Sequence, residues 1–188
     1  MVHVDDFLAT GAGPELKWLK GKVQEKFECT GDVLGPDEGQ KKEVRYLNRI
    51  LRWTDRGIEY EADDKHVNNI LRELGMLECS SAITPGVKED DEFEKTPDSQ
   101  LNCAEKTQMR KVIALANYLS QDRPSLGFAV KEMARTMACP NGTTSKQVKR
   151  LARFIQGAPR EVHLLRWQTM PKFICVQSDS DWAGCKRT

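Results

Sequence analysis

The chain opens with Val2-His3-Val4-Asp5-Asp6-Phe7-Leu8-Ala9-Thr10-Gly11, in which two adjacent carboxylates stand between two short apolar runs. This pattern predicts a β-hairpin whose tight bend carries Asp5 and Asp6. Carboxylates held at a bend suit a divalent cation such as Mg²⁺, which takes oxygen ligands from one or two carboxylates and the rest from phosphates and water. Two aspartates also favour an ordinary solvated turn. These ten residues alone therefore leave both interpretations open.

The same ten residues resemble the aromatic-x-Asp-Asp hairpin of reverse transcriptases, in the form found in copia-type retrotransposons. His3 stands where that family usually has Tyr.

Three later segments resemble the same family and follow in the family's order. Residues 118–130 are similar to its Arg-Pro-Asp segment, with Ser125 in place of Asp. Residues 149–157 are similar to its Lys-Arg-x-x-Arg-Tyr-Leu-x-Gly stretch, and residues 178–185 to the Asp-x-Asp-Trp-Ala-Gly segment that opens the RNase H domain. Four matching segments in one order argue against coincidence.

The resemblance implies a fragment of a retrotransposon Pol polyprotein, an RNA-directed DNA polymerase that runs into the start of RNase H. It implies two-metal nucleotidyl transfer on an RNA/DNA primer–template duplex with deoxynucleotide substrates. Mg²⁺, or alternatively Mn²⁺, would be held by Asp5 and Asp6 in the polymerase and by Asp179 in RNase H. Such an enzyme needs further carboxylates upstream and downstream, from the remainder of the Pol polyprotein. We therefore expect the chain alone neither to polymerise nor to cleave.

The expected fold class is α+β, with four parts. A C-terminal part of a reverse-transcriptase palm, built from β-hairpins and two helices, would cover residues 1–78, followed by an acidic linker over 79–103. A helical thumb and connection would cover 104–168, and the first strand of an RNase H-like domain would lie in 169–188. Apolar periodicity and turn residues predict the individual elements: helices over 14–28, 64–75, 104–120, 125–137 and from 143–145 onward, with strands in 43–54, 58–61, 161–168 and 172–177.

The last of these helices, over residues 143–157, has two contrasting faces. At about 100° per residue, its basic side chains fall within one sector, and its apolar side chains fall on the opposite side. The basic residues are Lys146, Lys149, Arg150 and Arg153, and the apolar ones are Val148, Leu151, Ala152 and Ile155. A helix of this kind packs on a domain and presents cations to a nucleic-acid backbone. A solubilising surface is the alternative interpretation.

Charge and composition narrow the class of protein. Residues 1–100 carry 14 Lys and Arg against 22 Asp and Glu, whereas residues 101–188 carry 15 against 6. A basic C-terminal half suits a phosphate-backbone partner or a solvated helical surface. The sequence has no apolar run of the length that spans a bilayer, and its acidic N-terminus is unlike a signal peptide. Six cysteines lack any Cys-x-x-Cys spacing.

These features predict an intracellular protein, either cytoplasmic (in a virus-like particle) or nuclear, that is not secreted and has no membrane partner. Three functions remain open: a fragment of the polymerase, a non-catalytic nucleic-acid-binding remnant acting through the basic helix 143–157, and a helical protein without a ligand.

Overall fold

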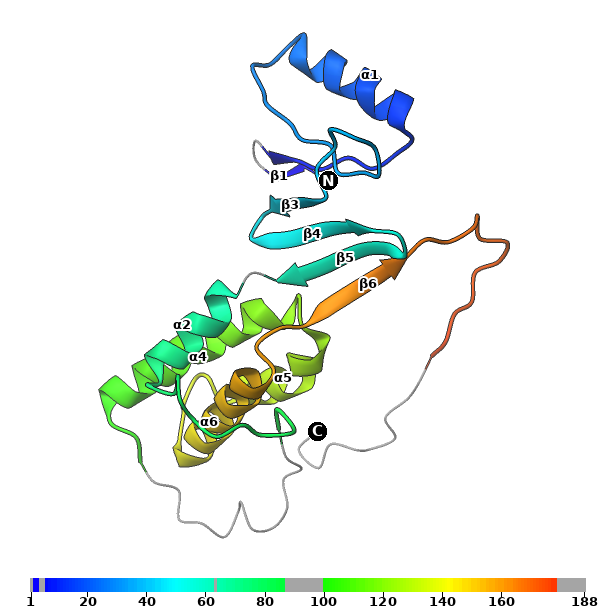
Figure 1. Cartoon of the computed structure of the whole chain (residues 1–188). Helices are drawn as coiled ribbons and strands as arrows, with labels where there is room; N and C mark the ends of the chain where they lie inside the picture. The colour runs from blue at the N-terminus through cyan, green and yellow to red at the C-terminus, as the bar shows by residue number, and fades with distance from the viewer. Residues whose placement is uncertain (1, 4–5, 63, 87–99, 179–188) are drawn as a thin grey trace.

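The computed structural model describes residues 2–3, 6–62, 64–86 and 100–178 of the 188-residue chain. It confirms the predicted α+β class. An antiparallel sheet has the strand order β3-β4-β5-β6, and a bundle of helices lies at one end of it (Figure 1). The strands are β3 (Glu43–Tyr46), β4 (Arg49–Thr54), β5 (Gly57–Ala62) and β6 (Val162–Arg166).

The N-terminal unit contains the predicted hairpin. Strands β1 (Val2–His3) and β2 (Asp6–Phe7) pair antiparallel, with His3 opposite Asp6. Asp6 therefore lies in β2 and not, as expected, in the bend, and Asp5 is outside the described residues. Helix α1 (Gly13–Gln24) follows, with a proline in its first turn, where the missing N–H is tolerated.

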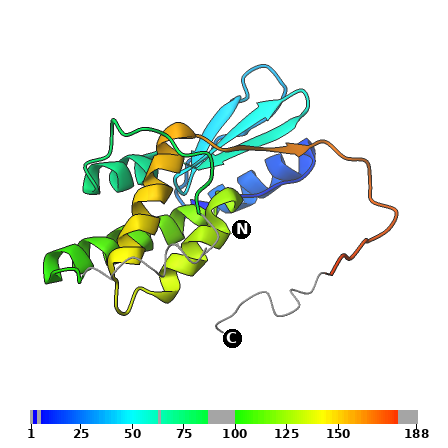
Figure 2. The same ribbon diagram turned by 90° about the horizontal axis from the view of Figure 1, so that it is seen from below.

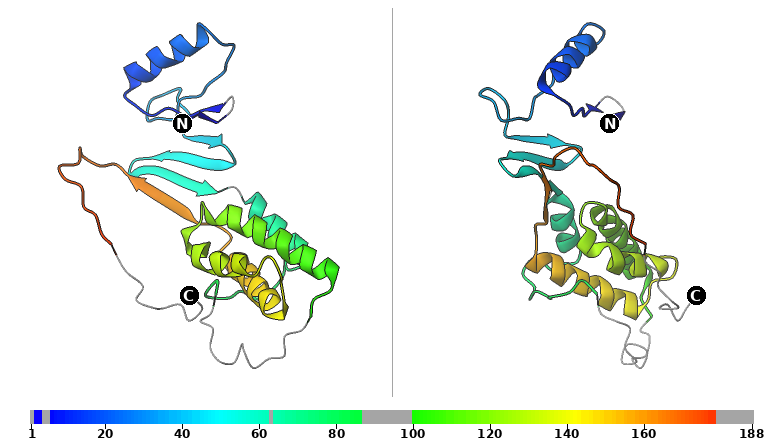
Figure 3. Two further views of the ribbon diagram at one scale, coloured as in Figure 1. Left: turned by 180° about the vertical axis from the view of Figure 1, so that it is seen from behind. Right: turned by 90° about the vertical axis from the view of Figure 1, so that its right-hand side faces the viewer.

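Helix α1 has the expected apolar stripe, but none of its residues is buried. Trp18 is 65% exposed and Leu19 is 39% exposed. The hairpin and α1 lie beyond β3, on the side of the sheet away from the other helices (Figures 1 and 3).

The strands expected in 43–54 are present, but a tight turn divides this stretch. Leu47 and Asn48 have φ angles of 48° and 60°, which are the positive values of a type I′ hairpin turn. Asn tolerates this conformation better than Leu does. The stretch had an ambiguous period because it contains two strands, β3 and β4, and not one.

Strand β6 joins the sheet against β5, with Glu61 opposite Val162 and Gly57 opposite Arg166. It confirms the strand predicted in 161–168. Gly57 has a φ of 154°, and a Cβ added to it would lie 2.1 Å from the carbonyl oxygen of Leu165. Only glycine lets β6 come this close. The second strand predicted nearby, over residues 172–177, is wrong, because these residues adopt no strand conformation in the structure.

The helical bundle is built from α2 (Lys65–Glu73), α4 (Cys103–Ser120), the 3₁₀ turn η1 (Pro124–Leu126), α5 (Gly127–Arg135) and α6 (Gly142–Gly157). Figure 2 shows α6 crossing α4 at a steep angle. The helices share one apolar core, whose fully buried side chains include those that the helical periodicity predicts on α4: Met109, Val112, Ile113, Ala116 and Leu119.

Two details of the bundle differ from expectation. Helical spacing over residues 125–137 predicts a buried face with Phe128, Ala129, Met133 and Met137 or their neighbours. Ala129 and Met133 are buried, but Phe128 is 74% exposed, and Leu126 and Val130 are buried instead. Helix α6 is capped by Asn141, whose side chain accepts from the N–H of Thr144, in a reciprocal capping box. No helix in the described ranges has the length and apolar character of a membrane span.

The sheet and the bundle both combine early and late parts of the sequence. Helix α2 belongs to the N-terminal part of the chain, yet Val67, Ile70 and Leu71 are buried in the same core as α4 and α6. Strand β6 comes after the bundle in sequence and pairs with β5 from before it. The chain therefore crosses between sheet and bundle more than once.

Candidate functional site

The predicted metal ligands are only partly within the described residues. Asp6 lies in β2 with an exposed side chain, whereas Asp5 and Asp179 lie outside the described residues. Among the residues that the structure does describe, no three His, Cys, Asp or Glu side chains are grouped so as to hold a metal ion. The assignment of Asp5, Asp6 and Asp179 to metal binding stays a prediction.

The basic face of α6 is present, but its four cations differ in their surroundings. Lys146 and Lys149 are exposed. Arg150 donates from Nη2 to the hydroxyl of Thr84 at 2.7 Å, and Arg153 donates from Nε to the carbonyl oxygen of Ser80 at 2.8 Å. The two arginines therefore contact a segment of the same chain.

That segment, residues 77–86, is called the strap below. Two further contacts fix it to the last turns of α6. The Ala82 N–H donates to the Arg153 carbonyl at 3.1 Å, and Gln156 Nε2 donates to the Leu77 carbonyl at 2.9 Å. The strap runs along α6 before the chain reaches α4, and it lies mostly at the surface, with Ile83 94% exposed.

The acidic hairpin and the basic helix do not meet. In Figures 1 and 3 the hairpin β1-β2 lies beyond one edge of the sheet, and α6 lies in the bundle at the other end. The structure therefore gives two separate candidate surfaces, one acidic and one basic.

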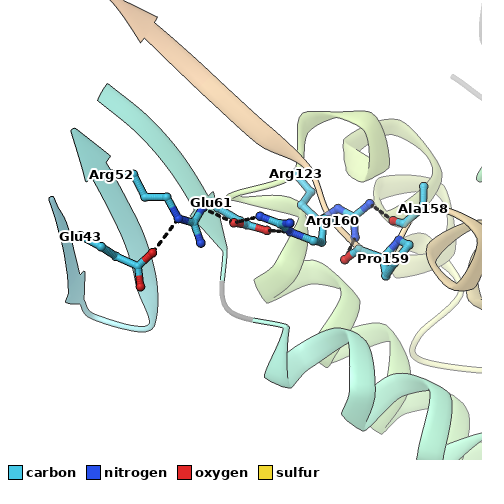
Figure 4. Close-up of polar contacts among 7 residues, drawn as sticks. All are labelled: Glu43, Arg52, Glu61, Arg123, Ala158, Pro159 and Arg160. Carbon is cyan, nitrogen blue, oxygen red and sulfur yellow. Dashed lines mark hydrogen bonds and ion pairs between the residues drawn. The ribbon is translucent and has the colours of Figure 1, made fainter. Parts of the chain in front are cut away.

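Sequence reasoning missed an ionic seam, defined here as the charged side chains that join the sheet to the bundle. At its centre is Glu61 of β5, which is 4% exposed (Figure 4). Arg160 donates to both of its carboxylate oxygens, at 2.5 and 2.8 Å, and Arg52 donates to one of them at 2.6 Å. These hydrogen bonds, chiefly those from Arg160, lower the pKa of Glu61 from 4.5 to about 2.

Asp122 forms the second contact of the seam. It follows α4 and is 7% exposed. Arg49 of β4 donates to it from Nε at 2.8 Å, and the hydroxyl of Tyr60 donates to the same oxygen. The hydrogen bond to Asp122 raises the pKa of Arg49, and burial together with Asp122 raises the pKa of Tyr60. This cluster ties the middle of the sheet to the end of α4.

Arg123 forms the third contact and is 2% exposed. Its Nη2 donates to the Ala158 carbonyl at 2.7 Å and its Nη1 to the Pro159 carbonyl at 3.3 Å, so it satisfies carbonyls just beyond the end of α6 (Figure 4). Its Nε donates to Glu161 at 3.3 Å, and Ser125 donates to the same carboxylate oxygen. Asp122 therefore binds side chains of the sheet, and Arg123 binds the segment that leads from α6 to β6.

The sequence contains one signal for the seam, since Asp122 and Arg123 lie in the segment that resembles the family's Arg-Pro-Asp motif. It gave no signal for Glu61, because a glutamate in an alternating strand is usually solvated. Its partner Arg160 lies 99 residues later, and no local pattern links the two.

Known proteins similar to this chain come from Arabidopsis thaliana. The uncharacterized mitochondrial protein AtMg00810 is 28% identical over 194 residues, which cover 100% of this chain and 73% of that protein. The retrovirus-related Pol polyprotein from transposon RE1 is 25% identical, and that from transposon RE2 is 24% identical. No family model and no solved structure matches the chain.

The similarity to the two polyproteins covers 99% and 98% of this chain but 12% of each polyprotein. The predicted resemblance to a retrotransposon Pol polyprotein is therefore confirmed at low identity. The chain corresponds to a small part of these relatives.

Proposed function

We propose that this chain is part of the reverse transcriptase of a copia-type Pol polyprotein, running into the start of its RNase H domain. The observation that carries the proposal is the similarity of nearly the whole chain to two transposon Pol polyproteins. The substrates would be an RNA/DNA primer–template duplex and deoxynucleotides, as in the family that the acidic hairpin resembles.

The acidic hairpin would hold the metal in the complete enzyme. Asp6 fits this role because its carboxylate is exposed at the start of β2. Carboxylate oxygens are the ligands that Mg²⁺ and Mn²⁺ prefer. Bound ions would activate the primer 3′-hydroxyl and stabilise the leaving pyrophosphate. Asp5 and Asp6 supply two ligands of that site, and Asp179 would do so in RNase H.

Binding of Mn²⁺ to the purified chain tests the metal ligands. We expect the paramagnetic ion to broaden backbone amide signals of residues 2–9, and the double substitution of Asp5→Asn with Asp6→Asn to remove the effect. Asp55→Asn is the matched control, since Asp55 is, like Asp6, an exposed aspartate of a β-hairpin. Equal broadening at Asp55 and at the acidic hairpin would show ordinary carboxylates and contradict the assignment.

Catalysis is tested in a chimera, because the relatives are far longer than this chain. The matching segment of the transposon RE1 polyprotein would be replaced by this chain and assayed for primer extension. We expect extension that requires Mg²⁺ and is abolished by Asp5→Asn. Extension that survives this substitution would remove Asp5 from the catalytic site.

A second candidate function is nucleic-acid binding without catalysis, favoured by the exposed Lys146 and Lys149 on a helix that has no acidic residue. In that case the chain alone binds a duplex in a salt-dependent manner, and the Asp5 and Asp6 substitutions change nothing. Replacing both lysines with Gln would weaken binding, whereas Lys131→Gln, at an exposed lysine of α5, would not.

A further inference from the structure

The strap occupies the two arginines of the basic face through weak acceptors. Arg150 donates a hydrogen bond to a neutral hydroxyl and Arg153 donates one to a neutral carbonyl. The Nε of Arg150 is buried and has no hydrogen-bond partner in the structure. A guanidinium offers five N–H groups in a fork that matches a phosphate, and paired charges bind more strongly than neutral acceptors do. A phosphate would therefore satisfy these arginines better than the strap does.

The strap is also built to detach. It contributes no residue to the buried core. It contacts α6 through the four hydrogen bonds described above and through the close approach of Ser81 to Gly157. Its isoleucine, Ile83, is 94% exposed. Its displacement therefore exposes little apolar surface and leaves the packing of α6 on α4 unchanged.

We propose that the strap competes with the phosphates of a nucleic-acid duplex for Arg150 and Arg153. Helix α6 then binds a duplex in two states, through Lys146 and Lys149 while the strap is docked and through all four cations once the strap is displaced. The inference rests on the proposed nucleic-acid function and assigns that surface an intramolecular competitor.

Gly157 provides a specific way to displace the strap. It is the last residue of α6, and a Cβ added to it would lie 2.5 Å from the Cβ of Ser81. The substitution Gly157→Ala therefore pushes the strap away while it favours the helix itself. Removing the opposing Cβ with Ser81→Gly makes room again, so the double variant is the matched control.

The measurement is the salt dependence of binding to an RNA/DNA duplex by the full chain. The slope of log K against log salt is about −0.9 for each phosphate contact, so two contacts give about −1.8 and four give about −3.6. We expect a slope of about −1.8 for wild type and about −3.6 for Gly157→Ala. The double variant of Gly157→Ala with Ser81→Gly should return to about −1.8. Thr84→Val, which removes the acceptor of Arg150 and the hydrogen bond from Thr84 to the Gly86 carbonyl within the strap, should give an intermediate slope.

A second substitution shows which cations take part. In the Gly157→Ala background, Arg150→Gln should remove about one contact from the slope, whereas in wild type it should change the slope little. Equal effects of Arg150→Gln in the two backgrounds would contradict competition.

The outcomes separate this inference from the proposed function. Duplex binding with the same salt slope in wild type and Gly157→Ala would overturn the proposed competition by the strap. It would leave the proposal that the basic face binds nucleic acid unaffected. Weaker binding by Gly157→Ala would show that the strap orders the face, which also overturns competition. An absence of duplex binding in every variant would overturn both the competition and the nucleic-acid surface.

Discussion

Glu61 of β5 and Arg160 of the segment before β6 form a two-point ion pair, with hydrogen bonds of 2.5 and 2.8 Å. The carboxylate is nearly buried, while the guanidinium stays largely at the surface. Arg52 holds the carboxylate from the neighbouring strand. Because Arg160 lies two residues before the start of β6, this pair fixes where the chain leaves the bundle and enters the sheet.

Replacing Glu61 with Gln should destabilise the protein at neutral pH. The neutral amide loses the charge that Arg52 and Arg160 share, and we expect the free energy of unfolding to fall by about 1–3 kcal/mol. Urea denaturation measures the change. Glu43→Gln is the control, since Glu43 contacts the same Arg52 at 2.7 Å but is 57% exposed. Glu43→Gln should lower the free energy of unfolding by less than about 1 kcal/mol. An equal loss of stability in both variants would contradict the importance of the burial of Glu61.

The stabilisation by Glu61 should depend on pH in the acid range. Its pKa falls from 4.5 to about 2 on folding, so its contribution is complete above pH 4.5 and is lost as the pH drops toward 2. The difference in unfolding free energy between wild type and Glu61→Gln should therefore be constant from pH 7 to 5 and shrink below 4.5. Urea titrations at several pH values test this, and a difference that persists unchanged down to pH 2 would contradict it.

Arg123→Met should destabilise the end of α6. The substitution keeps the apolar volume but leaves the Ala158 and Pro159 carbonyls without this donor and removes one of the donors to the Glu161 carboxylate. We expect the free energy of unfolding to fall by about 2–4 kcal/mol, and thermal unfolding measures this change. Arg56→Met, at an exposed arginine in the β4–β5 turn, should change little. Equal midpoints of thermal unfolding for the two variants would show that Arg123 does not stabilise the protein.

The sequence predicted best where a strong period coincided with burial. Helices α2, α4 and α6 have apolar residues at helical spacing, and the core confirms the predicted faces. Prediction failed where tertiary contacts decide. The Leu47-Asn48 turn has no glycine to mark it, and residues 172–177 have a strand-like composition without a neighbouring strand. Helix α1 has an apolar stripe that the structure leaves exposed, since amphipathicity does not say what covers it.

The candidate site shows the same limit. Helical spacing placed Lys149, Arg150 and Arg153 on one face, and the structure agrees. Spacing does not reveal whether a cation meets solvent, a phosphate or its own chain, and two of these cations meet the strap. The acidic pair was predicted from a local pattern, and the hairpin is confirmed, but its metal depends on ligands that no local pattern locates.

Gly57→Ala should break the pairing of β5 with β6. An added Cβ would lie 2.1 Å from the Leu165 carbonyl oxygen, and the φ of 154° is unfavourable for any residue with a side chain. The new methyl group would meet backbone atoms, which cannot turn aside as a flexible side chain can, so β6 must move away. We expect the free energy of unfolding to fall by at least about 2 kcal/mol. Hydrogen exchange measures the broken pairing directly, because the β6 amides lose their protection. Gly21→Ala in α1, where a Cβ meets nothing within 4 Å, should leave that protection unchanged. If β6 stays protected in Gly57→Ala, the close approach of the two strands is not required for the sheet.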